Sequence, residues 1–209
     1  MSDIKIGRIP LGMYQTNCYF VYREDLREAV IFDPADSGDY IYKALTDKGF
    51  SIKAIALTHG HFDHIFGVKK LKAAAECKVY ALDKEEKLLG DMNLNVSVSV
   101  GRPVVVEPDI LLRDNEEFSV AGITFKTLST PGHTAGSACY YIEEAGYLIA
   151  GDTLFSGSIG RSDLPTGNGP ELIESIENRI FTLPGETKVY PGHGDTTTVE
   201  FEKENNPFF

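Results

Sequence analysis

The sequence predicts an α/β fold in which two β-sheets pack against each other and helices cover their outer faces. Two observations favour it. The 209 residues contain two blocks rich in short β-like runs, and each block leads into segments with helical periodicity. Because sheets and amphipathic helices each bury an apolar face, such blocks assemble in layers. A single doubly wound parallel sheet is the alternative that the same pattern allows.

The first block begins with β-like runs at residues 4–9, 18–22 and 29–33, the last ending at a proline turn signal. Residues 40–48 then carry apolar side chains at helical spacing. Beyond them the chain alternates, with strands expected at 54–57 and 78–81 and helices at 66–75 and 84–89.

The second block follows a stretch rich in glycine and proline. We expect three strands, a helix and a final strand before a polar C-terminal segment: 123–128, 138–142, 147–150, 171–181 and 188–190. The sequence shows no linker, repeat or low-complexity tract, and its length suits one core. A single domain over residues 1–209 is therefore expected.

Charge and composition narrow the partners. Twenty basic residues against 31 acidic ones give a net charge of −11, which repels polyanions and disfavours nucleic acid as a partner. Cys18, Cys77 and Cys139 are odd in number and form no C-x-x-C pair, as in a reducing compartment. No leader pattern or bilayer-length apolar run is present, so we expect a cytoplasmic protein without a membrane partner. A homo-oligomer is left open.

The most informative stretch is Thr-His-Gly-His-Phe-Asp-His at 58–64, directly after an apolar run. In an extended segment, residues two apart point to the same side, so His59 and His61 can reach one metal ion. Asp63 and His64, where the chain turns into the next helix, can face a second ion. This spacing predicts a metal site.

Three further candidates, His133, Asp152 and His193, each follow a predicted strand. Loops that leave neighbouring strands converge on one rim of a sheet, so these side chains can meet the first cluster. Taken singly, each is more often a structural or solvated turn residue. The short cluster outweighs that interpretation, because four imidazoles or carboxylates within six positions repel one another or stay unsatisfied unless solvated or bound to cations.

Four motifs together carry a family resemblance: Thr-His-Gly-His-Phe-Asp-His at 58–64, Thr-Pro-Gly-His-Thr at 130–134, Gly-Asp-Thr-Leu-Phe at 151–155 and Tyr-Pro-Gly-His-Gly at 190–194. With these motifs in this order, the chain resembles the metallo-β-lactamase superfamily, and within it the glyoxalase II-like (hydroxyacylglutathione hydrolase-like) branch. The resemblance implies an αββα sandwich of two packed mixed sheets, with two divalent metal ions at one edge. Zinc is the favoured metal, and iron and manganese also suit imidazole and carboxylate ligands.

The resemblance also implies a division of the ligands. It assigns His59, His61 and His133 to the first ion, Asp63, His64 and His193 to the second, and Asp152 to both.

The implied activity is hydrolysis of a thioester or a similar small acyl compound. Two ions about 3.5–4 Å apart share a water and lower its pKa towards roughly 7, so the bridging hydroxide attacks the carbonyl carbon. A thiol has a pKa of about 8.5, so thiolate leaves readily. The resemblance makes Asp63 and Asp152 the catalytic residues, with Asp63 accepting the remaining proton.

Arg161 is the candidate for binding a carboxylate of the substrate; a structural ion pair is the alternative. In the glyoxalase II proteins a lysine-aromatic-tyrosine run contacts glutathione, and Arg-Ser-Asp at 161–163 stands in its place. Whether glutathione is part of the substrate therefore stays open.

Three other functions compete with hydrolysis. A single-iron persulfide dioxygenase shares these motifs and a Gly-Arg-[Ser/Thr]-Asp segment like that at 160–163. A nuclease resembling RNase Z is disfavoured by the acidic charge balance. A metal-binding protein without enzymatic activity is the third. The identity and number of bound metal ions separate the hydrolase from the dioxygenase.

Overall fold

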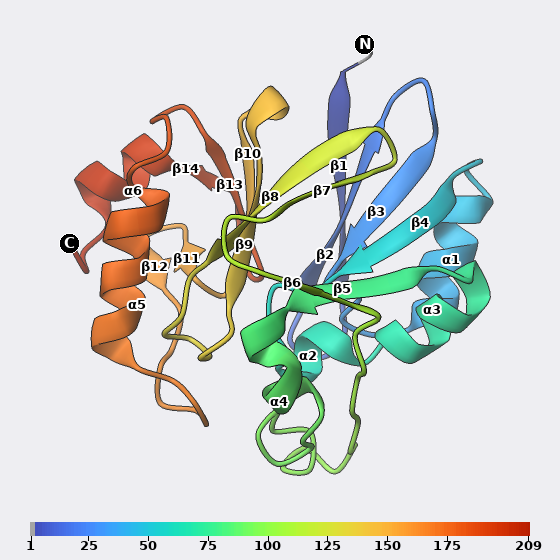
Figure 1. Ribbon diagram of the computed structural model, residues 1–209, viewed down its shortest axis with the longest axis horizontal. Helices are drawn as coiled ribbons and strands as arrows, with labels where there is room; N and C mark the ends of the chain where they lie inside the picture. Colours follow the sequence, from blue (N-terminus) through green and yellow to red (C-terminus); the bar gives the residue numbers. More distant parts are fainter. Residues whose placement is uncertain (1–2) are drawn as a thin grey trace.

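The computed structural model describes residues 3–209 and shows two sheets packed face to face with helices outside them (Figure 1). The N-terminal half of the chain forms one sheet and its helices, and the C-terminal half forms the other. The predicted αββα sandwich is confirmed, and the doubly wound alternative is wrong.

Residues 3–112 form six strands and four α-helices. Their bounds, with one 3₁₀ turn, are β1 (Ile4–Leu11), β2 (Thr16–Arg23), β3 (Glu28–Phe32), α1 (Gly38–Thr46), β4 (Ser51–Ala56), α2 (Phe62–Ile65), α3 (Val68–Ala75), β5 (Lys78–Leu82), the turn Asp83–Glu85, α4 (Glu86–Leu89) and β6 (Ile110–Leu112).

The second half contains eight strands and two α-helices, with a further 3₁₀ turn and a π-helical turn. Their bounds are β7 (Glu117–Val120), β8 (Ile123–Ser129), β9 (Ala138–Ile142), the turn Glu143–Ala145, β10 (Tyr147–Gly151), β11 (Leu154–Phe155), β12 (Ser158–Ile159), α5 (Gly169–Ser175), the π turn Ile176–Ile180, β13 (Lys188–Pro191), β14 (Thr197–Thr198) and α6 (Val199–Asn205).

Both large sheets have six strands and mix parallel with antiparallel pairs. The first has the order β1-β2-β3-β4-β5-β6 and becomes parallel from β3 onward. The second has the order β14-β13-β10-β9-β8-β7, and only its β10–β13 pair is parallel. Strands β11 and β12 form a separate small hairpin.

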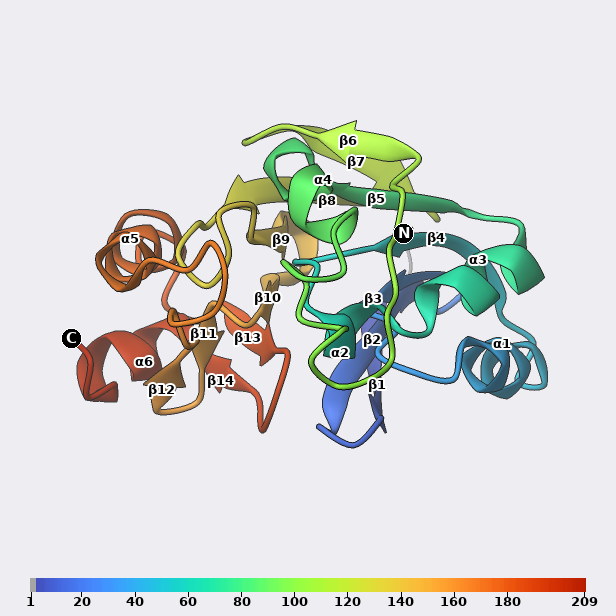
Figure 2. The ribbon, with the colours of Figure 1, turned by 90° about the horizontal axis from the view of Figure 1, so that it is seen from below.

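Alternation along the strands creates three apolar layers. On β3, Ile31 points towards α1 and α3, while Phe32 points towards the other sheet. On β10, Leu148 points towards α5, while Ile149 joins Phe32 between the sheets. Figure 2 shows the consequence from below, with α1 and α3 on one flank of the molecule and α5 and α6 on the other.

Some predicted elements differ in detail. The helix expected at 66–75 begins two residues later, as α3, and the short helix α2 before it was not predicted. Gly67 lies between them and packs so tightly that a Cβ there would lie 2.6 Å from the Pro34 carbonyl oxygen. The helix expected at 171–181 ends in a π turn. Strands β6 and β7 were not predicted, because they are only three and four residues long.

None of the helices formed by residues 3–209 is long and apolar enough to span a bilayer.

Phe125 tests the layer between the sheets. Its fully buried ring lies 5.5 Å from the ring of Phe32 and 5.2 Å from that of Phe118, measured between centroids. Phe125→Ala is expected to lower the free energy of unfolding by about 3–5 kcal/mol, because it leaves a cavity between the sheets. The matched control is Phe201→Ala, at a phenylalanine that is 51% exposed, with an expected change within about 0.5 kcal/mol. Urea unfolding of both variants measures the difference, and equal midpoints would contradict this account of the core.

Candidate metal centre

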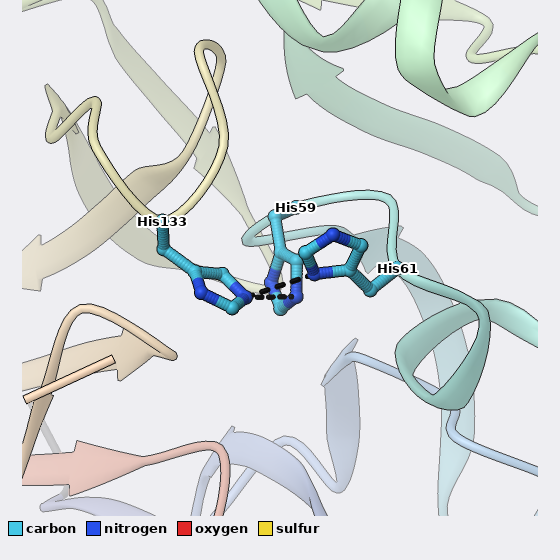
Figure 3. Close-up of side chains that lie close together, drawn as sticks. All are labelled: His59, His61 and His133. Carbon is cyan, nitrogen blue, oxygen red and sulfur yellow. Dashed lines mark hydrogen bonds between the residues drawn. The ribbon is translucent and has the colours of Figure 1, made fainter. Parts of the chain in front are cut away.

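The predicted ligands come from four loops, which follow β4, β8, β10 and β13. The first of these strands belongs to one sheet and the other three belong to the second sheet, so the loops meet where the two sheets come together. Figure 3 shows the loop after β4 and the loop after β8 turning their histidines towards each other. The strand ends thus bring together residues that are up to 134 positions apart, from His59 to His193.

His59, His61 and His133 form the first group. The Nε2 atom of His133 lies 2.9 Å from Nδ1 of His61 and 3.2 Å from Nε2 of His59 (Figure 3). All three potential ligand atoms lie within 4.8 Å of one another, and all three side chains are buried. Three imidazole nitrogens directed at one point are the ligand set of a tetrahedral metal site with one open position.

Asp63, His64 and His193 form the second group, and their potential ligand atoms also lie within 4.8 Å of one another. The Oδ2 atom of Asp63 is 3.3 Å from Nε2 of His193 and 3.9 Å from Nε2 of His64. Asp63 also accepts a hydrogen bond of 3.2 Å from the hydroxyl of Thr16. This group combines two imidazoles with one carboxylate.

Asp152 lies between the two groups. Its Oδ1 is 3.3 Å from Nε2 of His64, and its Oδ2 is 3.7 Å from Nε2 of His133 and 3.6 Å from Nε2 of His193. The carboxylate therefore faces one member of the first group and two of the second. That is the position expected of a group shared by two cations.

Hydrogen bonds on the far side of the rings orient His59 and His64. The Thr58 hydroxyl donates to Oδ2 of Asp33 at 2.6 Å and accepts from Nδ1 of His59 at 3.1 Å. The Nδ1 atom of His64 donates to the same carboxylate at 2.9 Å. Because each Nδ1 carries a hydrogen, it is Nε2 that faces the site and that can bind a cation when it is deprotonated, as in metal-binding histidines.

His133 and His193 are held in the same way by backbone carbonyl oxygens. Nδ1 of His133 donates to the carbonyl of Arg161 at 2.6 Å, and Nδ1 of His193 donates to the carbonyl of Tyr14 at 3.2 Å. A carbonyl can only accept, so both rings present Nε2 as a lone pair to the site.

The residues present fit a pair of divalent cations. Nε2 of His64 and Oδ1 of Asp152 are buried and lie 3.3 Å apart, and within residues 3–209 neither makes a hydrogen bond in good geometry, so their ion pair leaves both incompletely satisfied. Such groups are costly unless something else binds them. Gly192 keeps the space beside them open, since a Cβ there would lie 2.1 Å from Oδ1 of Asp152. Imidazole and carboxylate donors suit zinc, iron and manganese alike.

Comparison with known proteins agrees with this geometry. Residues 11–193 match the Metallo-beta-lactamase superfamily. The chain belongs to this superfamily. The probable metallo-hydrolase YqgX of Bacillus subtilis (strain 168) is 40% identical over 98% of this chain and 97% of its own length. The hydroxyacylglutathione hydrolase GloC of Haemophilus influenzae is 31% identical over 98% of both chains.

Two solved structures of the superfamily are similar throughout. The BLEG-1 B3 metallo-beta-lactamase has a TM-score of 0.93 and 40% identity, covering 98% of this chain and 99% of its own. TTHA1623, crystallised in a di-iron-bound form, has a TM-score of 0.85 and 33% identity, covering 97% of this chain and 100% of its own. Proteins this similar thus carry different names, and one of them, TTHA1623, holds two iron ions.

Within this member of the superfamily, burial and charge set the protonation of the histidines. Burial lowers the pKa of His59 far below its usual value, lowers that of His61 to about 3, and lowers that of His133 as well. These rings are therefore neutral at pH 7, so no proton has to leave before a cation binds.

His64 differs from the other buried rings. Burial again acts to lower its pKa, but the carboxylates of Asp152, Asp63 and Asp33 outweigh burial and raise the pKa well above its usual value. For Asp152, burial acts to raise the pKa, and His64, His133 and His193 outweigh it and lower the pKa. In the metal-free protein the two side chains therefore form a buried ion pair.

Asp33 was not predicted as a site residue. It directly follows β3, is buried, and accepts two hydrogen bonds from Thr58, from the backbone N–H at 2.8 Å and from the hydroxyl at 2.6 Å. Asp33 also lies within ligand distance of His59 and His64. Because its oxygens already accept hydrogen bonds from Thr58 and His64, we interpret it as the residue that orients the rings. Its place after a strand was the available signal.

Glu85 was also missed. This carboxylate is 1% exposed and joins two of the ligand loops. Its Oε1 accepts from the N–H of Gly60, between His59 and His61, at 2.7 Å, and from the hydroxyl of Thr134, next to the third histidine, at 3.0 Å. The positions of the first group of ligands thus depend on one buried acid.

A hollow of about 410 Å³ opens over the metal centre. Tyr14, Phe155 and Ile159 line it, and so does Arg161, whose guanidinium makes two hydrogen bonds of 2.7 Å to Asp163. The predicted substrate-binding arginine therefore lies at the site and is also part of an exposed ion pair. The complete lining is Tyr14, His61, Phe62, Asp63, His133, Asp152, Phe155, Ser158, Ile159, Arg161, Leu164 and His193.

The role of Asp33 can be tested by its removal. Asp33→Ala leaves three donors from Thr58 and His64 without their acceptor, so we expect metal affinity to fall about 10- to 100-fold. Competition with a chromophoric chelator measures that affinity. Asp39→Ala, at an exposed aspartate, is the control and is expected to bind metal like the wild type. Wild-type affinity in Asp33→Ala would refute the orienting role.

Glu85 predicts a pH dependence of stability. Burial raises its pKa from 4.5 to about 7. Between these values the folded protein keeps a proton that the unfolded chain releases, so this contribution is present below about pH 4.5 and is lost as the pH rises through about 7. The free energy of unfolding of the wild type is therefore expected to fall between about pH 5 and pH 8. In Glu85→Gln, which cannot titrate at this position, that fall should be smaller by about 2 kcal/mol.

Urea unfolding of the metal-free wild type and of Glu85→Gln at both pH values gives that difference. Glu86→Gln, at the exposed neighbouring glutamate, should follow the wild type. Parallel pH profiles for wild type and Glu85→Gln would show that the acid is ionised in the folded protein throughout.

Proposed function

We propose that the chain is a dinuclear-metal hydrolase that cleaves thioesters or similar small acyl compounds. The observation that carries the proposal is the pair of ligand groups that share one carboxylate, with Asp152 within 3.7 Å of His64, His133 and His193. Such a site suits two-metal chemistry rather than a purely structural ion, because the hollow above it is open to substrate.

The chemistry divides between the cations and the side chains. When bound, two divalent cations supply hydroxide at neutral pH and a Lewis acid for the acyl oxygen. Asp63 is ionised, since its pKa is lowered by His64 and His193 against the opposing effect of burial. Its Oδ2, which faces His193 and the Thr16 hydroxyl, is placed to accept a proton from the attacking group. Asp152 holds the two halves of the site together.

A thioester suits this site because, apart from the ligands, no carboxyl, imidazole or ammonium group of residues 3–209 lines the hollow to protonate a leaving group. A thiol with a pKa of about 8.5 leaves as thiolate without such help. The name of the Haemophilus relative, hydroxyacylglutathione hydrolase, supports this substrate class. Arg161 lies at the hollow and could exchange its bond to Asp163 for an anionic group of the thiol carrier.

Zinc is the metal we propose, and the di-iron form of TTHA1623 makes iron the first alternative. A second candidate function is hydrolysis of a β-lactam amide, favoured by the 40% identity with the BLEG-1 B3 metallo-beta-lactamase. A single-iron persulfide dioxygenase is the third. Two metal ions per chain together with thioester turnover would support our proposal. Cleavage of the β-lactam nitrocefin without thioester turnover would favour the lactamase instead, and one iron ion per chain with oxygen consumption would favour the dioxygenase.

Removal of a single proposed ligand tests the proposal directly. His59→Ala and Asp152→Ala are each expected to lose metal and to lower thioester hydrolysis at least about a hundredfold, because loss of a ligand should cost more than loss of its hydrogen-bond partner. The core between the sheets does not include either residue, so circular dichroism should stay unchanged. Metal analysis and a thioester panel that includes S-lactoylglutathione are run on the same samples.

Asp195→Ala is the control, since this exposed aspartate lies only two positions from His193. It should retain metal and activity. An Asp152→Ala protein that hydrolyses thioesters without bound metal would overturn the proposal.

A further inference from the structure

A second cavity, of about 500 Å³, lies next to the metal centre. It adjoins the hollow over the metal centre, because Tyr14, Phe62 and Asp63 line both. The remaining lining comes from the β1–β2 turn, the segment after β3, α2 and its C-terminal flank, and the loop before β6. A molecule bound at the metals can therefore extend into this space.

The cavity is lined mainly by apolar side chains, some of them unusually exposed. Met13 is 91% exposed and Val100 is 39% exposed, while Leu11 and Ala35 form the buried part of the wall. Exposed apolar side chains grouped beside a functional site are typical of a binding surface. This grouping indicates an apolar ligand.

The charged side chains of this wall neutralise each other. The guanidinium of Arg102 makes hydrogen bonds of 2.7 and 3.0 Å to the two carboxylate oxygens of Asp36. Its opposite surface lies over the ring of Phe66, 4.0 Å from the centroid. Apart from Asp63 at the metal centre, no other charged side chain lines the cavity within residues 3–209. It therefore offers no unpaired charge to an ionic ligand.

The hollow on the other side also holds an ion pair, but a more exposed one. Arg161 lines it and bonds to Asp163, and these side chains are 61% and 67% exposed, whereas Asp36, the partner of Arg102, is 21% exposed. An anionic group of the thiol carrier can therefore replace Asp163 at Arg161 more readily than Asp36 at Arg102, which leaves the apolar cavity for the acyl portion. The two sides of the metal centre suit the two halves of a thioester.

We propose that the cavity bounded by Met13, Phe66 and Val100 binds the acyl chain of the substrate, and that the protein prefers thioesters with an apolar aliphatic or aryl acyl group over those with a short polar one. This inference rests on the proposed thioester hydrolysis. It adds a substrate class, which the metal ligands alone do not determine.

The first experiment measures kcat/KM of the metal-loaded protein for S-acyl-N-acetylcysteamines from acetyl to octanoyl. Burial of each additional methylene should raise kcat/KM about two- to fourfold until the cavity is filled. Val100→Asp places a charge in the wall and should abolish this dependence on chain length. Val98→Asp, on the same loop but outside the lining, should preserve it.

The reverse series keeps an acetyl group and lengthens the S-alkyl group. A gain that follows the alkyl length and not the acyl length would overturn the assignment of the cavity to the acyl chain. So would an equal acyl-length dependence in the wild type and in Val100→Asp.

A binding measurement separates this inference from the proposed activity. Calorimetric titration of the metal-loaded protein with carboxylates from acetate to octanoate probes the cavity without turnover. Affinity that rises with length in the wild type and in Val98→Asp, but not in Val100→Asp, supports the apolar site even if no thioester is hydrolysed. Affinity independent of length overturns it, even if thioesters are hydrolysed.

Discussion

The structure depends on the cost of gathering imidazoles and carboxylates in a space from which water is largely excluded. Burial alone disfavours a charge on His59, His61 and His133, and it equally disfavours the carboxylate of Asp152. A polar group in such a place needs a partner in every direction. The bonds on the outer side of the rings supply part of that need, and the proposed cations would supply the rest on the inner side.

Those outer bonds explain how separate loops are kept in register. Asp33 couples the end of β3 to Thr58 and His64, and Glu85 couples the loop after β4 to the loop after β8. Each acid therefore connects segments that are distant along the chain. Because both acids are buried, their bonds are shielded from competing water, and the ligand positions are set before any cation binds.

How much of the site could be predicted depends on how far apart the interacting residues are along the sequence. The spacing of His59 and His61 is local, and so is the position of each candidate ligand after a strand, so pattern alone was enough to propose these ligands. The contacts of Glu85 with Gly60 and Thr134 span 25 and 49 residues and have no periodic signal. The hydrogen bond from His133 to the backbone carbonyl of Arg161 likewise has no signal in the sequence, which pointed only to the Arg161 guanidinium. In the fold, β7 escaped prediction because its four residues are too few to establish alternation.

A related contrast separates the residues proposed to carry out the reaction from those proposed to select the substrate. The ligand motifs lie at the ends of largely buried strands, where the position of a side chain is dictated by the sheet. The walls that face the substrate come from irregular segments, such as the β1–β2 turn with Met13 and the loop that carries Val100 and Arg102. Such loops tolerate change without disturbing the core. Proteins similar to this chain are accordingly named as a metallo-beta-lactamase and as a hydroxyacylglutathione hydrolase, and we infer that the acyl group of this chain's substrate is selected by side chains outside the metal motifs.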